Sequence, residues 1–261
     1  MAAAVAWISL TPVKGLRLAA ADAVELTEDG IPGDRAFFLA DAQGAMVSSD
    51  RHGPLMAVIG EHDAATGTLV LRFPGDEVIA GPVELGGPEP VSFYGLNLSA
   101  RPVLGPFSAA LSQLCHAPLR MFAMPPGRPG ADRGRAGAVT LLSRASLERL
   151  RAEARESEPV DPRRFRMSLG IDGLDAHEED GWIGRELHAG AAVLRVVGNV
   201  GRCVVTTRNA DTGIVDRQTL RHLAAYRQEV ASTEPLPFGV HARVLAPGRV
   251  RVGDPVALVD P

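Results

Sequence analysis

The chain has 261 residues, of which 46% are hydrophobic and 22% charged, and its formal net charge is −4. This length has room for one large or two modest domains, and the composition is ordinary for a globular protein. The slightly acidic balance gives no support for a nucleic-acid or anionic-membrane partner, so a few placed Lys and Arg residues must bind any anion. Two cysteines make no disulfide framework and indicate a reducing compartment, so we expect a cytoplasmic protein.

The first hundred residues predict a series of short β-strands. The apolar N-terminus lacks a basic segment and therefore predicts a first strand rather than a signal peptide. Turn sequences at 41–44 and 64–67 each separate two apolar runs, which predicts two hairpins. Short strands at this spacing favour a barrel or a sandwich. The expected strands are residues 5–10, 24–26, 35–40, 45–48, 55–61, 69–73, 83–85 and 91–94.

Two helices are expected next, at residues 107–115 and at about 143–155. The first carries apolar residues at helical spacing, which makes Cys115 a core residue. Ser143 is a candidate N-cap of the second. The Pro- and Gly-rich segment 125–137 between them predicts a mobile loop; its three arginines could steer anions. The longest uncharged run, residues 102–119, is interrupted by two prolines and predicts no membrane span.

Beyond residue 160 the pattern returns to short strands with one further helix. The expected strands are residues 164–171, 186–187, 192–197, 203–207, 240–245, 249–252 and 256–259. The helix is expected at about 218–230. In a strand at 164–171 with Phe165 pointing inward, Arg164 and Arg166 would share a cationic face; the alternative is an ordinary solvent-facing edge.

Cys203 is the candidate centre of chemistry. Arg202 precedes it directly, and a neighbouring cation favours the thiolate that attacks electrophiles and binds soft metals. Gly201 lets a ligand approach the backbone closely. The alternative is a small buried hydrophobic residue, because free cysteines are among the most buried residue types.

Lys14 and Arg35 are candidate anion ligands. Both stand at expected strand–loop junctions, and a Lys and an Arg that converge on one phosphate make strong charge-assisted hydrogen bonds. The alternative is that each is an ordinary solvated cation. The sequence has no Walker loop, no dinucleotide fingerprint after a strand and no nucleophile elbow, and its histidines lack zinc-ligand spacing.

Taken in order, these segments resemble the MOSC family, the molybdenum-cofactor sulfurase C-terminal domain, together with its N-terminal β-barrel partner. The resemblance includes Thr-Pro-Val-Lys-Gly-Leu from residue 11, Asp-Arg-Ala-Phe-Phe from residue 34 and Thr-Leu-Leu-Ser from residue 140. It continues through residues 164–166, 178–184, 202–207, 211–213, 236–239 and 252–256. It is nearest to the amidoxime-reducing branch and its bacterial relatives. The family implies a mostly β fold with some helix, in two β-barrel-like domains at residues 1–100 and 101–261.

The resemblance also implies site residues. Cys203 would ligate molybdenum through its thiolate, and Lys14 and Arg35 would hold the pterin phosphate. The same cofactor groove would be lined by Ser143, Arg166, Ser168 and Arg202. Three positions depart from the family pattern: Gly15 stands where Ser is frequent, Met-Ser at 167–168 replaces Pro-Asn, and Gly201 replaces a Pro or Cys.

We therefore expect a molybdenum-cofactor oxidoreductase that reduces N-hydroxylated or N-oxide compounds by oxygen-atom transfer. The partners expected are a small-molecule substrate and a separate electron-transfer protein or reductase, because two cysteines cannot ligate an iron–sulfur cluster of the common forms. The alternatives are a sulfur carrier or transferase with a persulfide on Cys203, and a non-catalytic pterin-binding module.

Overall fold

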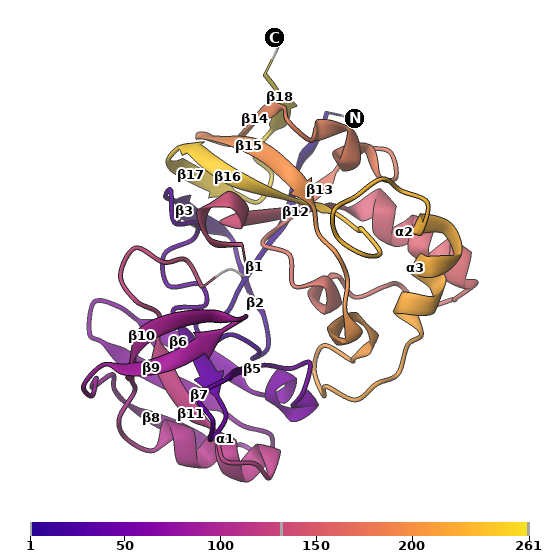
Figure 1. The fold of residues 1–261 in the computed structure, drawn as a ribbon. Helices are drawn as coiled ribbons and strands as arrows, with labels where there is room; N and C mark the ends of the chain where they lie inside the picture. Colours follow the sequence, from indigo (N-terminus) through magenta and orange to yellow (C-terminus); the bar gives the residue numbers. More distant parts are fainter. Residues whose placement is uncertain (1, 131–132, 260–261) are drawn as a thin grey trace.

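The computed structural model describes residues 2–130 and 133–259. The fold is mostly β, as predicted, and its strands form two parts that lie one above the other in Figure 1. The upper part contains the large sheet and both chain ends, and the lower part contains two smaller sheets. In the described parts of the chain, no helix combines the length and apolar character that crossing a bilayer requires.

The large sheet has eight strands in the order β18-β14-β15-β16-β12-β13-β1-β2. All neighbours are antiparallel except β12 and β13, which are parallel. Its apolar face packs around fully buried aliphatic side chains such as Ile8, Leu141 and Leu194. The strands are β1 (Ala4–Leu10), β2 (Ala19–Ala21), β12 (Val139–Ser143), β13 (Leu169–Asp172), β14 (Glu186–Ala189), β15 (Ala192–Asn199), β16 (Val240–Ala246) and β18 (Val256–Leu258).

The N-terminal segment belongs to this upper part. Strand β1 pairs with β13, and β3 (Ala23–Leu26) pairs with β17 (Gly248–Arg251). Strand pairing therefore crosses residue 100, where the sequence predicts a domain boundary, and that boundary stays a prediction. The loop after β1 leads from the upper part to the lower one, since the Lys14 amide in this loop donates to the carbonyl of Phe37 in the lower part at 2.8 Å.

The lower part contains a five-stranded sheet, β5-β4-β11-β10-β9, and a three-stranded sheet, β6-β7-β8. Both predicted hairpins are confirmed, since β4 pairs with β5 and β6 pairs with β7. The strands are β4 (Phe37–Ala40), β5 (Met46–Val47), β6 (Ile59–Asp63), β7 (Thr68–Arg72), β8 (Val78–Pro82), β9 (Glu89–Phe93), β10 (Leu96–Pro102) and β11 (Arg120–Ala123).

Three α-helices confirm the helical predictions. Helix α1 (Phe107–Cys115) buries Phe107 and Leu111 against the lower sheets. Helix α2 (Arg144–Ala154) begins at the predicted cap, because the Ser143 hydroxyl accepts a hydrogen bond from the Ala145 amide at 3.1 Å. Helix α3 (Thr219–Arg227) is shorter than predicted. Both α2 and α3 flank the upper part in Figure 1.

Several predicted strands are wrong, and the structure has 3₁₀ turns in three of these places. The segment predicted as 164–171 begins with η3 (Pro162–Phe165), whose Asp161 cap accepts from the Arg163 amide. The segment at 203–207 is η5 (Val204–Thr207), in which the two threonine hydroxyls donate to carbonyls three residues back. Likewise η1 (Gly53–Ala57) replaces the start of the strand predicted at 55–61. No strand forms at 83–85, and β2, β8, β10, β11 and β12 were not predicted.

Candidate functional site

A cavity of about 340 Å³ opens where the upper and lower parts meet. It is lined by loops rather than strand faces, chiefly the loops after β1 and β15 and the segment around η3. Six of the seven predicted site residues line it: Lys14, Arg35, Arg166, Ser168, Arg202 and Cys203. The predicted contacts of these residues with a cofactor stay predictions; the six residues line one cavity.

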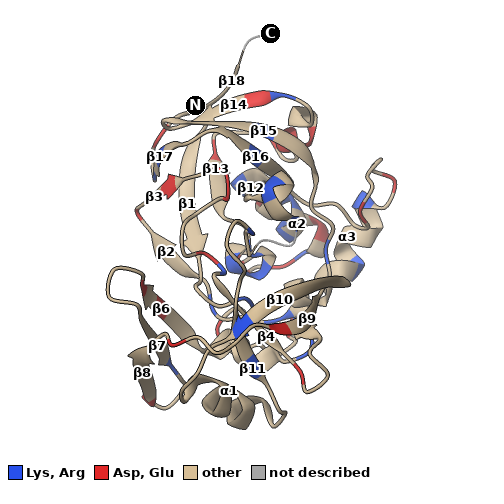
Figure 2. Ribbon diagram, turned by 60° about the vertical axis from the view of Figure 1, so that its left-hand side comes forward, with Lys and Arg blue, Asp and Glu red and all other residues tan. Residues whose placement is uncertain are grey.

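The cavity wall is strongly cationic. Among the described residues that line it, Asp50 is the single acidic one. The cationic lining residues number six: Lys14, Arg35, Arg133, Arg164, Arg166 and Arg202. In Figure 2 several blue stretches of ribbon, which mark Lys and Arg positions, lie in the region between the two parts. In a chain of net charge −4 this local excess makes the cavity suited to an anion.

Lys14 forms the lower wall of the cavity beside two aromatic rings. Its side chain is largely buried, with the residue 6% exposed, and its Nζ lies 5.1 Å from the Tyr94 ring centroid and 5.9 Å from that of Phe93. Gly15 follows at a φ of 96°, and a Cβ there would lie 3.0 Å from the Ser48 hydroxyl. Glycine at this position therefore makes room for a serine that itself lines the cavity.

Arg35 and Arg166 tie the two parts together at the cavity. Both adopt left-handed backbone angles, with φ of 52° and 56°. Arg35 pairs with Asp34 and donates from Nη2 to the Arg166 carbonyl at 2.9 Å. Arg166 in turn donates to the Leu16 carbonyl at 2.8 Å. Arg166 ends η3 rather than lying in a strand, so the predicted shared strand face with Arg164 does not exist.

Cys203 is exposed and begins η5 just beyond the end of β15. Main-chain hydrogen bonds of 2.9 Å between Val200 and the segment at Phe238 and Gly239 fix the backbone leading to it. The Cys203 carbonyl accepts from the Thr206 amide and hydroxyl at 3.1 and 3.0 Å. The thiol is thus placed at the cavity by an ordered turn, which is the opposite of the buried alternative.

Arg202 points away from its neighbour Cys203 and into the protein. Its Nε donates to the Phe238 carbonyl at 2.8 Å, and its Nη1 donates to the Phe165 carbonyl at 2.9 Å. The residue is 8% exposed, and burial lowers the pKa of its guanidinium. Because these donors are used by main-chain acceptors, the structure gives Arg202 the task of holding the Cys203 loop against η3.

Gly201 faces protein rather than open space. Its amide donates to Glu234 at 2.7 Å, and a Cβ on this glycine would lie 2.8 Å from the Glu234 Cβ. Glu234 also forms a two-bond ion pair with Arg133, from the Pro- and Gly-rich segment. Burial opposes ionisation of Glu234, but the hydrogen bonds from Arg133 and Gly201 outweigh it and lower the pKa of this carboxyl. The close ligand approach expected at Gly201 is therefore replaced by an anchor for the loop.

The structure does not bring Ser143 to the cavity. The side chain is fully buried and caps α2, and its amide donates to Glu179 at 3.1 Å. Ser168 does line the cavity, where its amide donates to the Thr140 hydroxyl at 2.8 Å. Other lining residues were not among the predicted site residues. Thr140 and Thr206 lie in segments that carry the family resemblance, whereas no motif pointed to Ser48, Ser49, Asp50 or Tyr94.

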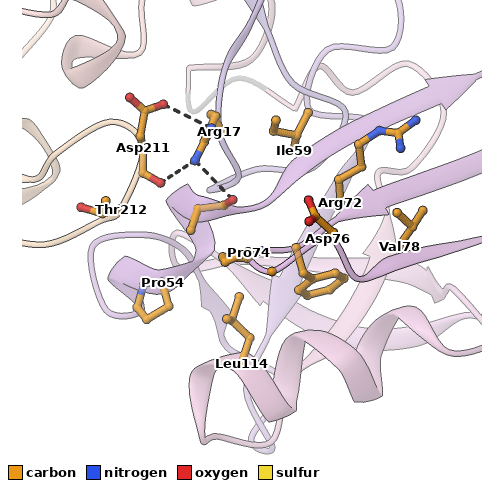
Figure 3. A pocket seen from close by; sticks show the side chains of 13 residues that line it. Arg17, Pro54, Ile59, Arg72, Pro74, Asp76, Val78, Leu114, Asp211 and Thr212 are labelled. Carbon is orange, nitrogen blue, oxygen red and sulfur yellow. Dashed lines mark hydrogen bonds and ion pairs between the residues drawn. The ribbon is translucent and has the colours of Figure 1, made fainter.

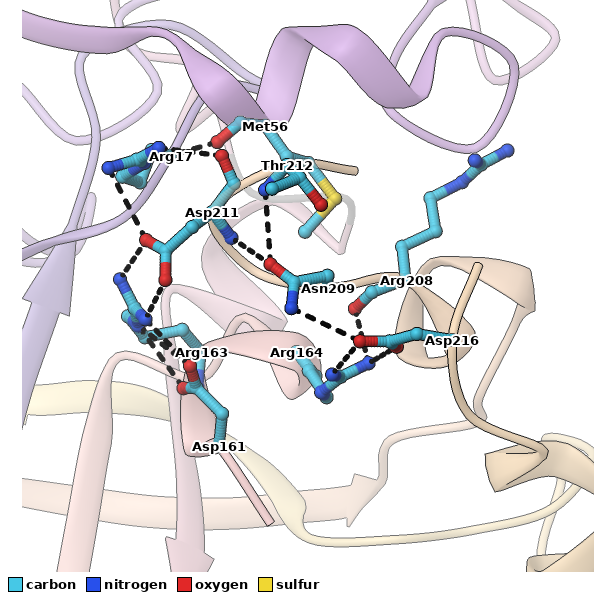
Figure 4. A network of polar contacts seen from close by, with 10 residues as sticks. All are labelled: Arg17, Met56, Asp161, Arg163, Arg164, Arg208, Asn209, Asp211, Thr212 and Asp216. Atoms are coloured by element: carbon cyan, nitrogen blue, oxygen red, sulfur yellow. Dashed lines mark hydrogen bonds and ion pairs between the residues drawn. The ribbon is translucent and has the colours of Figure 1, made fainter. Parts of the chain in front are cut away.

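A polar network holds the segment after Cys203 against the lower part (Figure 4). Asp211 accepts from Arg163 at 2.7 and 2.8 Å and pairs with Arg17 at 3.3 Å, while Arg17 donates to the Met56 carbonyl at 3.3 Å. Hydrogen bonds from Arg163 lower the pKa of the Asp211 carboxyl. Arg164 is held similarly by Asp216, at 2.6 and 2.9 Å. The network explains why this segment is ordered without strand pairing.

A second, more open cavity of about 890 Å³ lies on the lower part, next to Arg17 and Asp211 (Figure 3). Its wall includes Pro54 from η1, Ile59 from β6 and Leu114 from α1. None of the predicted site residues lines it. The chemistry expected from the sequence therefore belongs to the cavity at Cys203.

Two family models match successive segments of this chain. The family model described as MOSC N-terminal beta barrel domain matches residues 2–114, and the model described as MOSC domain matches residues 130–257. The mitochondrial amidoxime-reducing component 1 of Xenopus laevis is 38% identical over 128 residues, which are 46% of this chain and 36% of that protein. The human mitochondrial amidoxime reducing component 2 is 37% identical over 125 residues, again 36% of its length.

A more distant match is the molybdenum cofactor sulfurase of Oryza sativa subsp. japonica, 30% identical over 102 residues, which are 36% of this chain and 12% of that protein. The chain thus spans about a third of the amidoxime-reducing relatives and less of the sulfurase. The two family models together span most of the chain in the order that the sequence predicts. The chain belongs to the MOSC family, with a MOSC N-terminal β-barrel domain followed by a MOSC domain.

Proposed function

We propose that this protein is a molybdenum-cofactor-dependent oxidoreductase that reduces N-hydroxylated or N-oxide compounds. The observation that carries the proposal is the pairing, in one cavity, of an exposed thiol with Lys and Arg residues. The relatives that carry the amidoxime-reducing name support the reductive direction. The substrate class is part of the proposal.

The residues present fit such a cofactor. Molybdenum is a metal for which soft thiolate sulfur is a suitable ligand, and Cys203 offers that sulfur at the cavity. The pterin phosphate is an anion, and Lys14, Arg35 and Arg166 offer cationic donors in the same cavity. When bound, the molybdenum centre supplies the two-electron redox step, which no side chain of this protein can perform.

In this proposal the protein's own residues bind and orient the cofactor and anchor the loop that carries Cys203. Arg202 and Glu234 hold the Cys203 loop from behind, through the Phe238 carbonyl and the Gly201 amide. Arg35 and Arg166 join the two walls of the cavity, so that a ligand contacts both at a fixed separation. This rigidity is what a site needs to keep a reacting atom near one thiolate.

The electrons must come from outside the chain. The chain has two cysteines, which lie on α1 and at the cavity, and no dinucleotide fingerprint follows any of its strands. We therefore include in the proposal a separate electron-transfer protein or reductase that docks near the cavity. The sulfur-carrier alternative also uses an exposed Cys203, but it gives no reason for the cationic residues Lys14 and Arg166 in the same cavity.

The test is turnover of an N-hydroxylated amidine by the purified full chain with an artificial reductant. We expect reduction that scales with the molybdenum content of the preparation, and no sustained turnover with NADH alone. Reduction by molybdenum-free protein would contradict the proposal, and so would a fully loaded protein that reduces neither N-hydroxylated compounds nor N-oxides. Sustained NADH-driven turnover without any added protein would contradict the need for a separate donor.

A further inference from the structure

The tip of the β9–β10 hairpin carries an aromatic side chain to the cavity. Tyr94 and Gly95 form its two-residue turn, since Phe93 pairs with Leu96 on the flanking strands. Both turn residues have positive φ, 49° and 79°, which is the geometry that Asn-Gly or Gly-Gly satisfies with least strain. A tyrosine at this position is unfavourable for the turn, so the turn alone gives no reason for it.

The Tyr94 ring lies beside the Lys14 ammonium. The distance from Lys14 Nζ to its centroid is 5.1 Å, within the range at which an aromatic face attracts a cation. Phe93 packs edge-on against Tyr94, with centroids 5.2 Å apart and planes at 83°. Phe93 itself is buried in the apolar cluster of the five-stranded sheet. The buried Phe93 ring thus supports the exposed Tyr94 ring, and the Tyr94 ring lies next to the Lys14 ammonium.

Solvation alone would favour an exposed lysine and a buried tyrosine, but Lys14 and Tyr94 show the opposite. Lys14 is 6% exposed although it carries a charge, whereas Tyr94 is 55% exposed and lines the same cavity. A lysine stem has four rotatable bonds, so its ammonium needs neighbouring groups to hold it at one place. The two rings are among the groups that contact it, and they come from a hairpin far from Lys14 in the sequence.

We propose that Tyr94 is a positioning residue of the anion site: its ring orients the Lys14 ammonium toward a phosphate bound in the cavity. That the phosphate belongs to a pterin rests on the proposed function, whereas the role of the ring does not. The hydroxyl has no part in this role, so phenylalanine should replace tyrosine without loss. A leucine fills similar space but offers no aromatic face, so it should not replace tyrosine.

The experiment is a calorimetric titration of the full chain with inorganic phosphate. We expect Tyr94→Leu to weaken phosphate binding roughly two- to tenfold, the change that corresponds to loss of one cation–π contact. Tyr94→Phe should bind as the unmodified protein does. Leu96→Ala is the matched control, because Leu96 is an exposed residue of the same hairpin that does not line the cavity.

A second titration tests whether the Tyr94 ring affects phosphate binding through Lys14. In a Lys14→Ala background, Tyr94→Leu should cause no further loss, because the ring acts through the ammonium. Three results would overturn the inference. The first is equal phosphate affinity of Tyr94→Leu and the unmodified protein, and the second is an equal loss of affinity in Tyr94→Leu and Tyr94→Phe. The third is an unmodified protein that binds no phosphate. Ring-dependent phosphate binding in a protein isolated without molybdenum would support this inference and contradict only the proposed function.

Discussion

The two cysteines lie in regions that are ordered by different means. Cys115 ends α1, half-buried against the apolar cluster of the lower sheets, and burial raises the pKa of its thiol to about 11. Cys203 begins η5 in a segment without strand pairing, held by hydrogen bonds from arginines and to a glutamate. Packing makes the first thiol inert, whereas a polar scaffold presents the second to a cavity. Reactivity here depends on how a segment is held, and the residue type is the same.

The largest effect is expected from Cys203→Ser. Serine cannot replace a soft thiolate at a metal or carry a persulfide, so activity should fall to background while the fold stays intact. The matched variant Cys115→Ser should keep its activity and lose about 1 kcal/mol of unfolding free energy, because it places a hydroxyl on a half-buried apolar face. Turnover and urea unfolding of both variants measure this contrast. Unchanged turnover in Cys203→Ser would rule out both the oxidoreductase and the sulfur-carrier functions.

Thiol labelling sharpens the same comparison without mutation. A thiol of pKa near 11 rather than 9.0 has about a hundredfold less thiolate at pH 8, so Cys115 should react with iodoacetamide at least that much more slowly than an ordinary thiol. Cys203 is exposed and should be labelled first, with protection when the cavity is filled. Mass spectrometry of digested samples follows each site over time. Faster labelling of Cys115 would contradict the packing argument.

Cofactor retention should fall with each cationic residue that is removed from the cavity. Lys14→Ala and Arg35→Ala should each weaken cofactor retention by about 1.5–3 kcal/mol, the value of one charge-assisted hydrogen bond. The readout is molybdenum and pterin per chain after purification. Arg128→Ala is the control, since Arg128 is exposed and does not line the cavity. Full loading of the Lys14→Ala, Arg35→Ala double variant would contradict the assignment of the anion site.

The smallest effect concerns the anchor behind Cys203. Glu234→Gln should lower the unfolding free energy by about 1 kcal/mol at neutral pH, because its ion pair with Arg133 is partly exposed and screened. The pKa of Glu234 is lowered in the fold from 4.5, so this stability is present above pH 4.5 and lost as pH falls through the lowered value. Unfolding curves of both proteins should therefore converge in acid. Glu84→Gln, at an exposed glutamate, should show no such difference.

Periodic segments could be read from the sequence, and the loops could not. Helix α1 and the cap at Ser143 followed from spacing and residue type. The turn at η5 did not, because Val-Val-Thr-Thr has the composition of a strand and becomes a turn only through its own hydroxyl hydrogen bonds. Local hydrogen bonds from side chains to the backbone thus overrode the strand preference, as they did at η3, where the Asp161 cap and a proline begin a turn.

For the site, the sequence predicted which residues take part but not where their side chains point. The family resemblance pointed to Lys14, Arg35 and Cys203, and all three line the same cavity. Adjacency misled at Arg202, which lies next to Cys203 in the chain but turns toward the Phe238 carbonyl. It misled again at Gly201, where a ligand was expected to approach the backbone but Glu234 fills the space beside the glycine. A hydrogen-bond partner more than thirty residues away leaves no local signal.

The most direct test of the central claim is metal analysis of the freshly isolated full chain, followed by X-ray absorption at the molybdenum edge in the unmodified protein and in Cys203→Ser. The account predicts molybdenum and pterin in equal amounts, close to one per chain, and one sulfur fewer around the metal in the variant. Metal-free protein from cells that make the cofactor, carrying a cyanide-releasable sulfur on Cys203, would contradict it and establish the sulfur carrier instead.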